Sequence, residues 1–190
     1  MITVLLGVRA LAGLTACFLS AFVLAQSPWI PRDLHDEGPS SAWHYLPQHG
    51  QAYDVAGNYR DDVYFHSVGT YPTIYGMKNN RIAICVPKPD PPSHANDSLF
   101  RVDFAFAGHA AHDAVPVFVE QTDRRYNFYE QYTPDGVIGV TGARRVVYPS
   151  VYDSIDVHLY SNKWGPKMYI VVRPGGNPEH IKTYGKGTIA

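Results

Sequence analysis

Cysteine, charge and helical periodicity are all scarce in this sequence. The 190 residues include only two cysteines, Cys17 and Cys85, so a disulfide framework is excluded. Charged residues make up 17% of the chain and the formal net charge is −1, which argues against nucleic acid or an anionic membrane surface as a partner. No segment sustains a period of 3.6 residues over three turns, and no phosphate-binding loop or Gly-x-Ser-x-Gly nucleophile motif occurs. These absences remove helical folds and several common enzyme classes.

The long apolar run lies at the N-terminus. Arg9 precedes the uncharged run Ala10–Leu24, which has the length of a signal-peptide core and is short for a membrane span of about 20 residues. The sequence Val23-Leu24-Ala25 fits the small-x-small cleavage pattern. We therefore expect residues 1–25 to be a signal peptide cleaved before Gln26. The mature chain is then expected to be secreted or held at the cell surface, with the periplasm as an alternative, and to have no membrane span.

Two other forms of processing remain open. The signal could stay uncleaved as an anchor, or Cys17, which ends a Leu-Thr-Ala-Cys sequence, could be lipidated. Lipidation would leave the apolar segment Phe18–Leu24 on the mature protein, so cleavage after Ala25 is favoured. Cleavage leaves Cys85 as a lone thiol within the apolar run Ile82–Val86, where a small buried hydrophobic role is expected.

Alternation of apolar and polar residues dominates the mature chain. In Phe100–Phe106, apolar residues occupy every second position, with Arg101 and Asp103 between them. Ser154–Tyr160 repeats the pattern, and its Asp156 is expected to point outward. A half-buried strand has this period of two.

A hairpin and several weaker strands complete the prediction. Lys167–Val172 should pair with the preceding strand through the connection Ser161–Gly165, and Asn79 and Asn80 can supply a tight turn because asparagine tolerates positive φ. The weaker strand candidates are Val63–Val68, Thr73–Met77, Arg81–Val86, Ala114–Glu120, Arg125–Gln131 and Arg144–Tyr148. Many short strands separated by glycine, proline and asparagine predict an all-β fold, an antiparallel β-sandwich-like domain or an open barrel.

The expected organisation has three parts. Residues 1–25 are the signal peptide, residues 26–44 form an irregular lead-in rich in proline, and residues 45–190 form a single β-rich domain. The last residues, Thr183–Ala190, show no closing element. The chain is therefore expected to be either truncated or one piece of a longer architecture.

Nine histidines raise the possibility of a metal site. His109, His112 and Asp113 lie in one short segment and are residue types that bind zinc. No third spaced ligand is evident nearby, although folding could bring in His94 or His158. We favour a solvated loop over a zinc centre, which would otherwise indicate a metal-dependent hydrolase.

Paired carboxylates are the other catalytic candidates. Asp61 and Asp62 lie at a turn that enters a strand, where aspartate commonly accepts hydrogen bonds from local backbone. Asp153 and Asp156 flank the start of another strand. Because each has a structural explanation, we expect no catalytic residues, no cofactor and no bound metal.

Aromatic residues give the strongest binding signal. Trp164 at the hairpin tip, with Tyr160, Tyr169 and Trp43, could form an exposed platform for glycans or for another protein. The competing explanation is lateral packing of tyrosines across neighbouring strands, which stabilises many sheets.

Six stretches of the chain occur in the order seen in a known family. They are Tyr45–Gln51 (Tyr-Leu-Pro-Gln-His-Gly-Gln), Arg60–Phe65, Pro134–Val140, Arg144–Tyr148, Val151–Asn162 and Tyr169–Pro178. Over roughly Tyr45–Ile181, the chain resembles the N-terminal uncharacterised β-rich domain of large secreted proteins of the Bacteroidota. In that family the domain often precedes β-propeller-like (SBBP) or immunoglobulin-like repeats and a type IX secretion sorting domain.

The resemblance implies a β-rich extracellular or cell-surface module and brings no catalytic residues with it. Gln48 and His49 replace the Asn-Lys usual in the family's first motif, and this chain carries neither the repeats nor the sorting domain. The function expected from the sequence is therefore a non-catalytic structural or interaction module, whose partners are other extracellular domains, surface proteins or glycans. The alternatives are a glycan-binding module centred on Trp164 and a hydrolase using His109 and His112.

Overall fold

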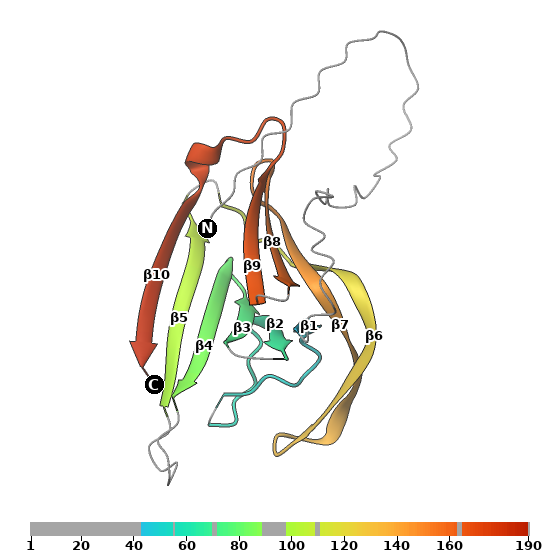
Figure 1. Ribbon diagram of the computed structural model, residues 1–190. Coiled ribbons are helices and arrows are strands. Elements are labelled where there is room, and N and C mark those ends of the chain that lie inside the picture. The colour runs from blue at the N-terminus through green and yellow to red at the C-terminus, as the bar shows by residue number, and fades with distance from the viewer. Residues whose placement is uncertain are drawn as a thin grey trace.

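The computed structural model describes residues 43–54, 56–69, 72–88, 98–108, 111–162 and 165–189 (Figure 1). The expected signal peptide, Cys17 and residues 26–42 of the lead-in lie outside these ranges. The elements are β1 (His44–Pro47), β2 (Val63–Val68), β3 (Thr73–Met77), β4 (Arg81–Lys88), β5 (Ser98–Ala107), β6 (Val117–Glu130), β7 (Thr133–Tyr152), β8 (Ile155–Asn162), β9 (Gly165–Val172), the 3-10 helix η2 (Pro178–His180) and β10 (Lys182–Ile189). The predicted all-β antiparallel fold is confirmed.

The strands form one continuous antiparallel sheet that curls into two layers. The order is β10-β5-β4-β3-β2-β1-β7-β8-β9, and β6 pairs with β7. Ala143 of β7 pairs with both Gln121 of β6 and Tyr45 of β1, whereas Arg145 pairs with Val119 of β6 and Tyr160 of β8. Because a strand has two edges, β1 and β8 occupy successive stretches of the edge opposite β6. The long strand β7 therefore joins the two layers.

The main hydrophobic core lies between these layers. It is formed by residues of both: Tyr45, Phe65, Ile74, Ile82, Phe106, Ala114, Val146, Tyr148, Val151, Tyr152, Ile155, Val157, Leu159, Ile170 and Val172. Burial of this many apolar side chains is the dominant stabilising contribution in a domain of this size. At the end of the sandwich, the Tyr152 hydroxyl lies 2.8 and 2.9 Å from the carbonyl oxygens of Ala107 and Lys182, to which its single proton can donate, and it accepts from the Lys182 amide at 3.1 Å. Tyr152 thus ties β7 to β5 and β10.

A close approach inside the core requires glycine at position 76. A Cβ atom on Gly76 would collide with the ring of Phe65 and with the hydroxyl of Tyr148. Because Phe65 and Tyr148 both belong to the core, any larger residue at this position would push the two layers apart.

Local sequence signals placed several elements correctly. β2 and β3 have the predicted bounds, and Asn79 and Asn80 form the turn before β4 with φ of 59° and 52°. The β8–β9 hairpin also forms, but pairing continues to Asn162 and Gly165. The predicted strands Ala114–Glu120 and Arg125–Gln131 overlap one strand, β6, which begins only at Val117, ends at Glu130 and continues between them through a bulge at residues 122–124.

Two expectations about strands are wrong. Asp156 is buried rather than outward-facing, as are His158 and Tyr160, so β8 is buried on both faces. The C-terminal segment does not lack a closing element, because β10 pairs along the whole of Lys182–Ile189 with β5. Local alternation could not reveal either outcome, since both depend on partners that are distant in the sequence.

Two further expectations are that the mature chain has no membrane span and that residues 26–44 form an irregular lead-in. Among the residues described, no helix has the length and apolar character needed to span a membrane. The first strand begins at His44, and both Trp43 and His44 are buried.

Candidate functional site

The predicted aromatic platform is largely inside the protein. Tyr160 of β8 and Tyr169 of β9 stack with ring centroids 4.8 Å apart and planes at 12°, and their hydroxyls share a hydrogen bond. Tyr160 is only 7% exposed and Trp43 only 6%, so the expectation that they are exposed is wrong. Trp164 lies outside the described residues. The stack has the geometry of a pair that stabilises neighbouring strands.

A buried cation lies against this stack. The Arg145 guanidinium is centred 5.6 Å from the Tyr160 ring, and its Nε donates to Glu120 at 2.9 Å. Arg145 is 1% exposed, and its Nη1 atom has no hydrogen-bond partner. Cation–π contact and the carboxylate together offset part of the cost of burying this charge.

His158 is the second polar residue buried on this face. Neither ring nitrogen has a hydrogen-bond partner. Burial, and then the nearby positive charge of Arg145, lowers the pKa of His158 to about 4. The neutral imidazole is therefore the native form, and this histidine does not reach the loop at His112 to complete a zinc set.

The loop weighed as a zinc site, and expected to be a solvated loop, is held by structural contacts. His112 is exposed, and its Nε2 lies 3.0 Å from Asp153 Oδ1. Asp113 accepts a hydrogen bond from the Asn79 amide at 2.9 Å, which fixes the loop to the β3–β4 turn. His109 lies outside the described residues. Within the part of the chain that the structure describes, no three histidine, cysteine or acidic side chains gather as a metal site would require.

The first carboxylate pair has cationic partners. Asp62 accepts from Arg60 at 2.8 Å and forms an ion pair with Arg81 at 3.3 Å, while Asp61 pairs with Lys78 at 3.3 Å. Hydrogen bonding from Arg60, and then its charge, lowers the pKa of Asp62. A carboxyl group that acts as a general acid needs a raised pKa, so Asp62 is poorly suited to that role.

In the second carboxylate pair, Asp153 lies at the surface and Asp156 in the interior. Asp153 is exposed, whereas Asp156 accepts from the Ser150 amide at 2.7 Å and from Arg173 at 3.0 Å.

Cys85 is buried, as expected, and burial raises the pKa of its thiol. A raised pKa disfavours the thiolate that a nucleophile needs.

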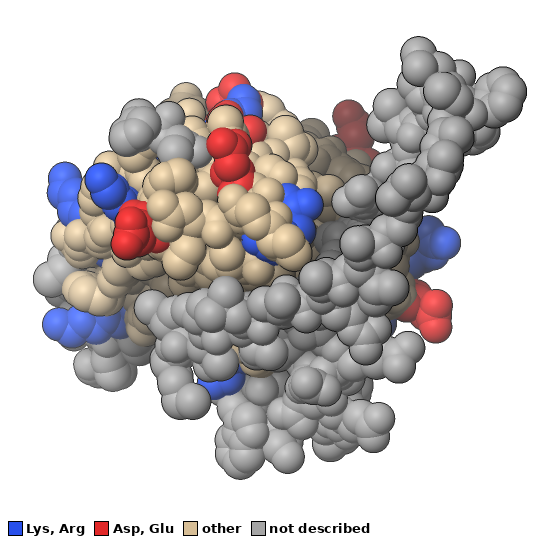
Figure 2. Space-filling view, turned by 90° about the horizontal axis from the view of Figure 1, so that it is seen from above, with Lys and Arg blue, Asp and Glu red and all other residues tan. Residues whose placement is uncertain are grey.

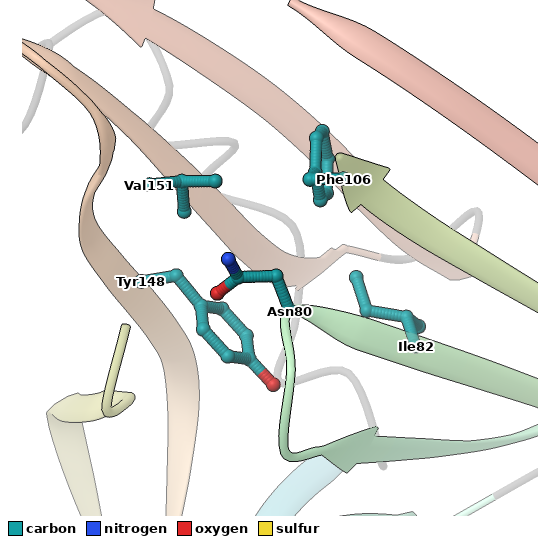
Figure 3. Close-up of a pocket in the computed structure, with 5 residues that line it drawn as sticks. All are labelled: Asn80, Ile82, Phe106, Tyr148 and Val151. Carbon is teal, nitrogen blue, oxygen red and sulfur yellow. The ribbon is translucent and has the colours of Figure 1, made fainter. Parts of the chain in front are cut away.

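An interior pocket lies at the end of the core beside the β3–β4 turn (Figure 3). Its walls come from three strands and the turn: Asn80, Ile82, Phe106, Tyr148 and Val151. The space between them is too small for a water molecule. The Tyr148 hydroxyl is buried without a hydrogen-bond partner, and burial raises its pKa. We interpret this pocket as a packing feature and not as a ligand site.

Exposed tyrosines lie elsewhere, where the β6–β7 hairpin meets the loop after β1. Tyr53 packs against Tyr59 and Tyr132, with ring centroids 5.6 and 5.5 Å apart. Tyr59 is 49% exposed and Tyr132 is 39% exposed. We call Tyr53, Tyr59 and Tyr132 the tyrosine cluster.

The sequence folds locally to present this cluster. Asp54 accepts from the amides of Ala56 and Asn58, both at 2.9 Å, and Tyr53 forms a β-bridge with Tyr59. Gly57 leaves space for the Tyr132 ring, which would collide with any Cβ there. The missed signal was this turn motif, Tyr-Asp-Val-Ala-Gly-Asn-Tyr, with a tyrosine at each end.

Further exposed apolar side chains lie on the other face of the hairpin. Phe128 packs against His66 of β2 and pairs with Val137, so the next residues along each strand, Tyr129 and Ile138, point away from β2. Each is 66% exposed. The end of the hairpin therefore presents apolar surface on both faces.

Charge does not concentrate on the surface that can be seen from above. Figure 2 shows lysine and arginine interspersed with aspartate and glutamate around an uncharged area, without a block of one sign. Such a surface gives no electrostatic support for nucleic-acid binding.

Together these observations define an all-β sandwich module with an exposed aromatic hairpin. The family described as a domain of unknown function (DUF7948) matches residues 45–189, which is most of the chain, and the protein belongs to that family. The match begins where the sequence resemblance begins, at Tyr45, and extends through β10. No curated protein and no solved structure matches the chain.

Proposed function

We propose that this protein is an exported, non-catalytic module that binds another protein through the tyrosine cluster. The single observation that carries the proposal is the exposure of Tyr59 and Tyr132, packed around Tyr53, at the end of a hairpin. Tyrosine is enriched at protein interfaces because it offers a large apolar ring together with a hydroxyl. Tyr129 and Ile138 add exposed apolar surface on the other face of the same hairpin.

The tilt of the rings favours a protein partner over a sugar. The planes of Tyr53 and Tyr59 meet at 65°, and those of Tyr53 and Tyr132 at 31°. A flat platform for a pyranose ring needs rings that share a plane, whereas a protein side chain can fill an angled recess.

Export is supported by the N-terminal sequence and by the family resemblance. Arg9 followed by the uncharged run Ala10–Leu24 has the form of a signal peptide. The resemblance to secreted domains of the Bacteroidota implies SBBP-like or immunoglobulin-like repeats and type IX sorting in related chains, and this supports a surface-associated role. N-terminal sequencing of the exported protein should begin at or near Gln26; an intact Met1 or a lipidated Cys17 would contradict this processing.

The absence of catalysis is proposed from the environment of the acidic groups. Asp62 is bound by Arg60 and Arg81, and Asp156 by the Ser150 amide and Arg173. These partners stabilise the ionised carboxylates and leave them with structural roles.

Site-specific photocrosslinking in the producing organism tests the interaction. We expect benzoylphenylalanine at position 59 to give a discrete protein adduct, and the same group at the exposed position 179 of η2 to give none. Tyr132→Ala should reduce the yield at position 59 several-fold without changing the melting temperature. Absence of an adduct, or equal adducts at both positions, would reject the interaction surface, and retention on a polysaccharide instead would favour the glycan-binding alternative.

A further inference from the structure

A second surface feature, a polar hollow, lies at the middle of the β6–β7 hairpin, away from the tyrosine cluster. Its volume is about 640 Å³, which falls in the range of ordinary small-ligand sites. It is lined by His44, Glu120, Gln121, Thr122, Asp123, Arg124 and Arg144. Six of these seven residues come from the long curved strands β6 and β7 (Figure 1).

A bulge in β6 creates the hollow. Gln121 pairs with Ala143 and Arg125 pairs with Thr141, so three residues of β6 stand opposite the single residue Gly142. Thr122 Oγ1 donates to the Gly142 carbonyl at 3.3 Å and closes the bulge. Bulges of this kind redirect side chains away from the regular pleat and are common beside functional sites.

The backbone at the start of the bulge is strained. Glu120 has φ of 57°, in the left-handed region that residues other than glycine seldom occupy. Its carboxylate accepts from Arg145, which is almost fully buried, and this ion pair holds the bulge in place. Strained backbone persists where the surrounding structure enforces it, and it is concentrated at binding sites.

The floor of the hollow is a buried histidine. His44 is 2% exposed, and its Nδ1 lies 2.7 Å from the Tyr126 hydroxyl. A Cβ at position 142 would lie 3.0 Å from His44 Cβ and 3.1 Å from Leu46 Cδ2, so Gly142 allows β1 to approach closely. The floor is therefore built by packing and does not depend on a mobile surface chain.

Positive charge converges on this floor. Arg124 and Arg144 line the hollow together with His44, and burial, followed by the positive charges of these two arginines, lowers the pKa of His44. Among the described residues, neither Arg124 nor Arg144 forms an ion pair. Glu120 is engaged by Arg145, so Asp123 is the one carboxylate of the lining left to oppose them.

We propose that the hollow binds the carboxylate of an acidic saccharide between Arg124 and Arg144. Guanidinium groups recognise carboxylates through paired, charge-assisted hydrogen bonds. The hollow is larger than an inorganic anion needs, and the neutral polar side chains of Gln121 and Thr122 offer hydrogen-bonding partners for sugar hydroxyls. The site uses none of the residues of the tyrosine cluster, so this proposal can be tested independently of the proposed protein interaction.

NMR titration of the full chain with D-glucuronate tests the site. We expect saturable shifts of the Thr122 and Gly142 amide signals with glucuronate and none with neutral glucose. Arg124→Gln and Arg144→Gln should each weaken binding at least tenfold, and added salt should weaken it as well. Asp123→Asn should strengthen binding two- to fivefold by removing the opposing carboxylate.

The matched control is Arg125→Gln. Arg125 is exposed and next in sequence to Arg124 but does not line the hollow, so its replacement should change the affinity less than twofold. All four variants alter exposed side chains and should keep the wild-type melting temperature. An equal loss in Arg125→Gln would show unspecific charge attraction and overturn the proposal.

Two further probes test whether the hollow prefers another negatively charged ligand to an acidic saccharide. Saturable binding of sulfate without binding of glucuronate would indicate an adventitious ion only. Tighter binding of N-acetylglutamate amide than of glucuronate would indicate an acidic peptide. Either result, or the absence of any saturable shift, would overturn the saccharide assignment.

Discussion

Strands β8 and β5 share the same alternating sequence pattern but lie in different surroundings. Ile155, Val157 and Leu159 of β8 face the core, and the residues between them are buried too. In β5 only Phe106 is fully buried at 5% exposure, while Phe100 at the other end is 44% exposed. β5 is covered at its edge by β10, whose described side chains are almost all exposed. Alternation therefore identifies which residues share a face, and the strand's position in the sandwich decides how deeply that face is buried.

The largest expected effect concerns the core face of β8. Val157→Asp places a charge among apolar side chains that cannot pair with it, and should cost about 4 kcal/mol or more, abolishing cooperative unfolding. Circular dichroism during urea denaturation measures this. Phe100→Asp is the control in β5, and it should keep a normal transition. Similar transitions for the two variants would remove the distinction between the strands.

The gradient along β5 gives the next effect. Phe106→Ala should cost about 3 to 4 kcal/mol, because it leaves a cavity in the core. Phe104, which is half-buried against the core, should show an intermediate loss, and Phe100→Ala should stay within about 0.5 kcal/mol. Equal losses at the three positions in urea denaturation would show that β5 is uniformly buried.

The pH dependence tests the buried second face of β8. Burial lowers the pKa of His158 to about 4 from its ordinary 6.5, so the folded state binds fewer protons than the unfolded state below pH 6.5. The stabilisation is complete above pH 6.5 and is lost as pH falls toward 4, by about 2 to 3 kcal/mol. His66, also lowered to about 4 by burial, adds loss in the same window.

The control for this titration is a histidine on the surface. His158→Gln should flatten the fall in unfolding free energy between pH 6.5 and 4, whereas His112→Gln, at an exposed loop, should leave it unchanged. If His112→Gln flattened the profile as much as His158→Gln, the difference in burial between the two histidines would be refuted.

The smallest effect compares two aspartates. Asp156→Asn should cost about 1 to 2 kcal/mol, because Asp156 is buried and accepts from the Ser150 amide and Arg173. Asp61→Asn should cost less than about 0.5 kcal/mol, since its ion pair with Lys78 is exposed. Chemical denaturation at neutral pH resolves the two, and the reverse order would contradict the burial of β8.

The candidate sites also combine features that a short segment of sequence determines with features that depend on contacts between distant segments. The turn flanked by Tyr53 and Tyr59 is a local motif that could have been found in the sequence, but its contact with Tyr132 joins segments far apart in the chain. The hollow depends on a bulge whose existence follows from the register of β6 against β7. Conversely, the hairpin that carries Tyr160 and Tyr169 is predictable from the sequence, but the burial of Tyr160 is not.

The sequence by itself determined the all-β class, the bounds of β2 and β3, and the Asn79–Asn80 turn. These follow from side-chain alternation and backbone preferences, which act over a few residues. Only the tertiary structure decided that β7 joins two layers, that β8 is buried on both faces, and that β10 pairs with β5. Burial and strand pairing depend on contacts between distant segments, and a local pattern carries no information about which segments will meet.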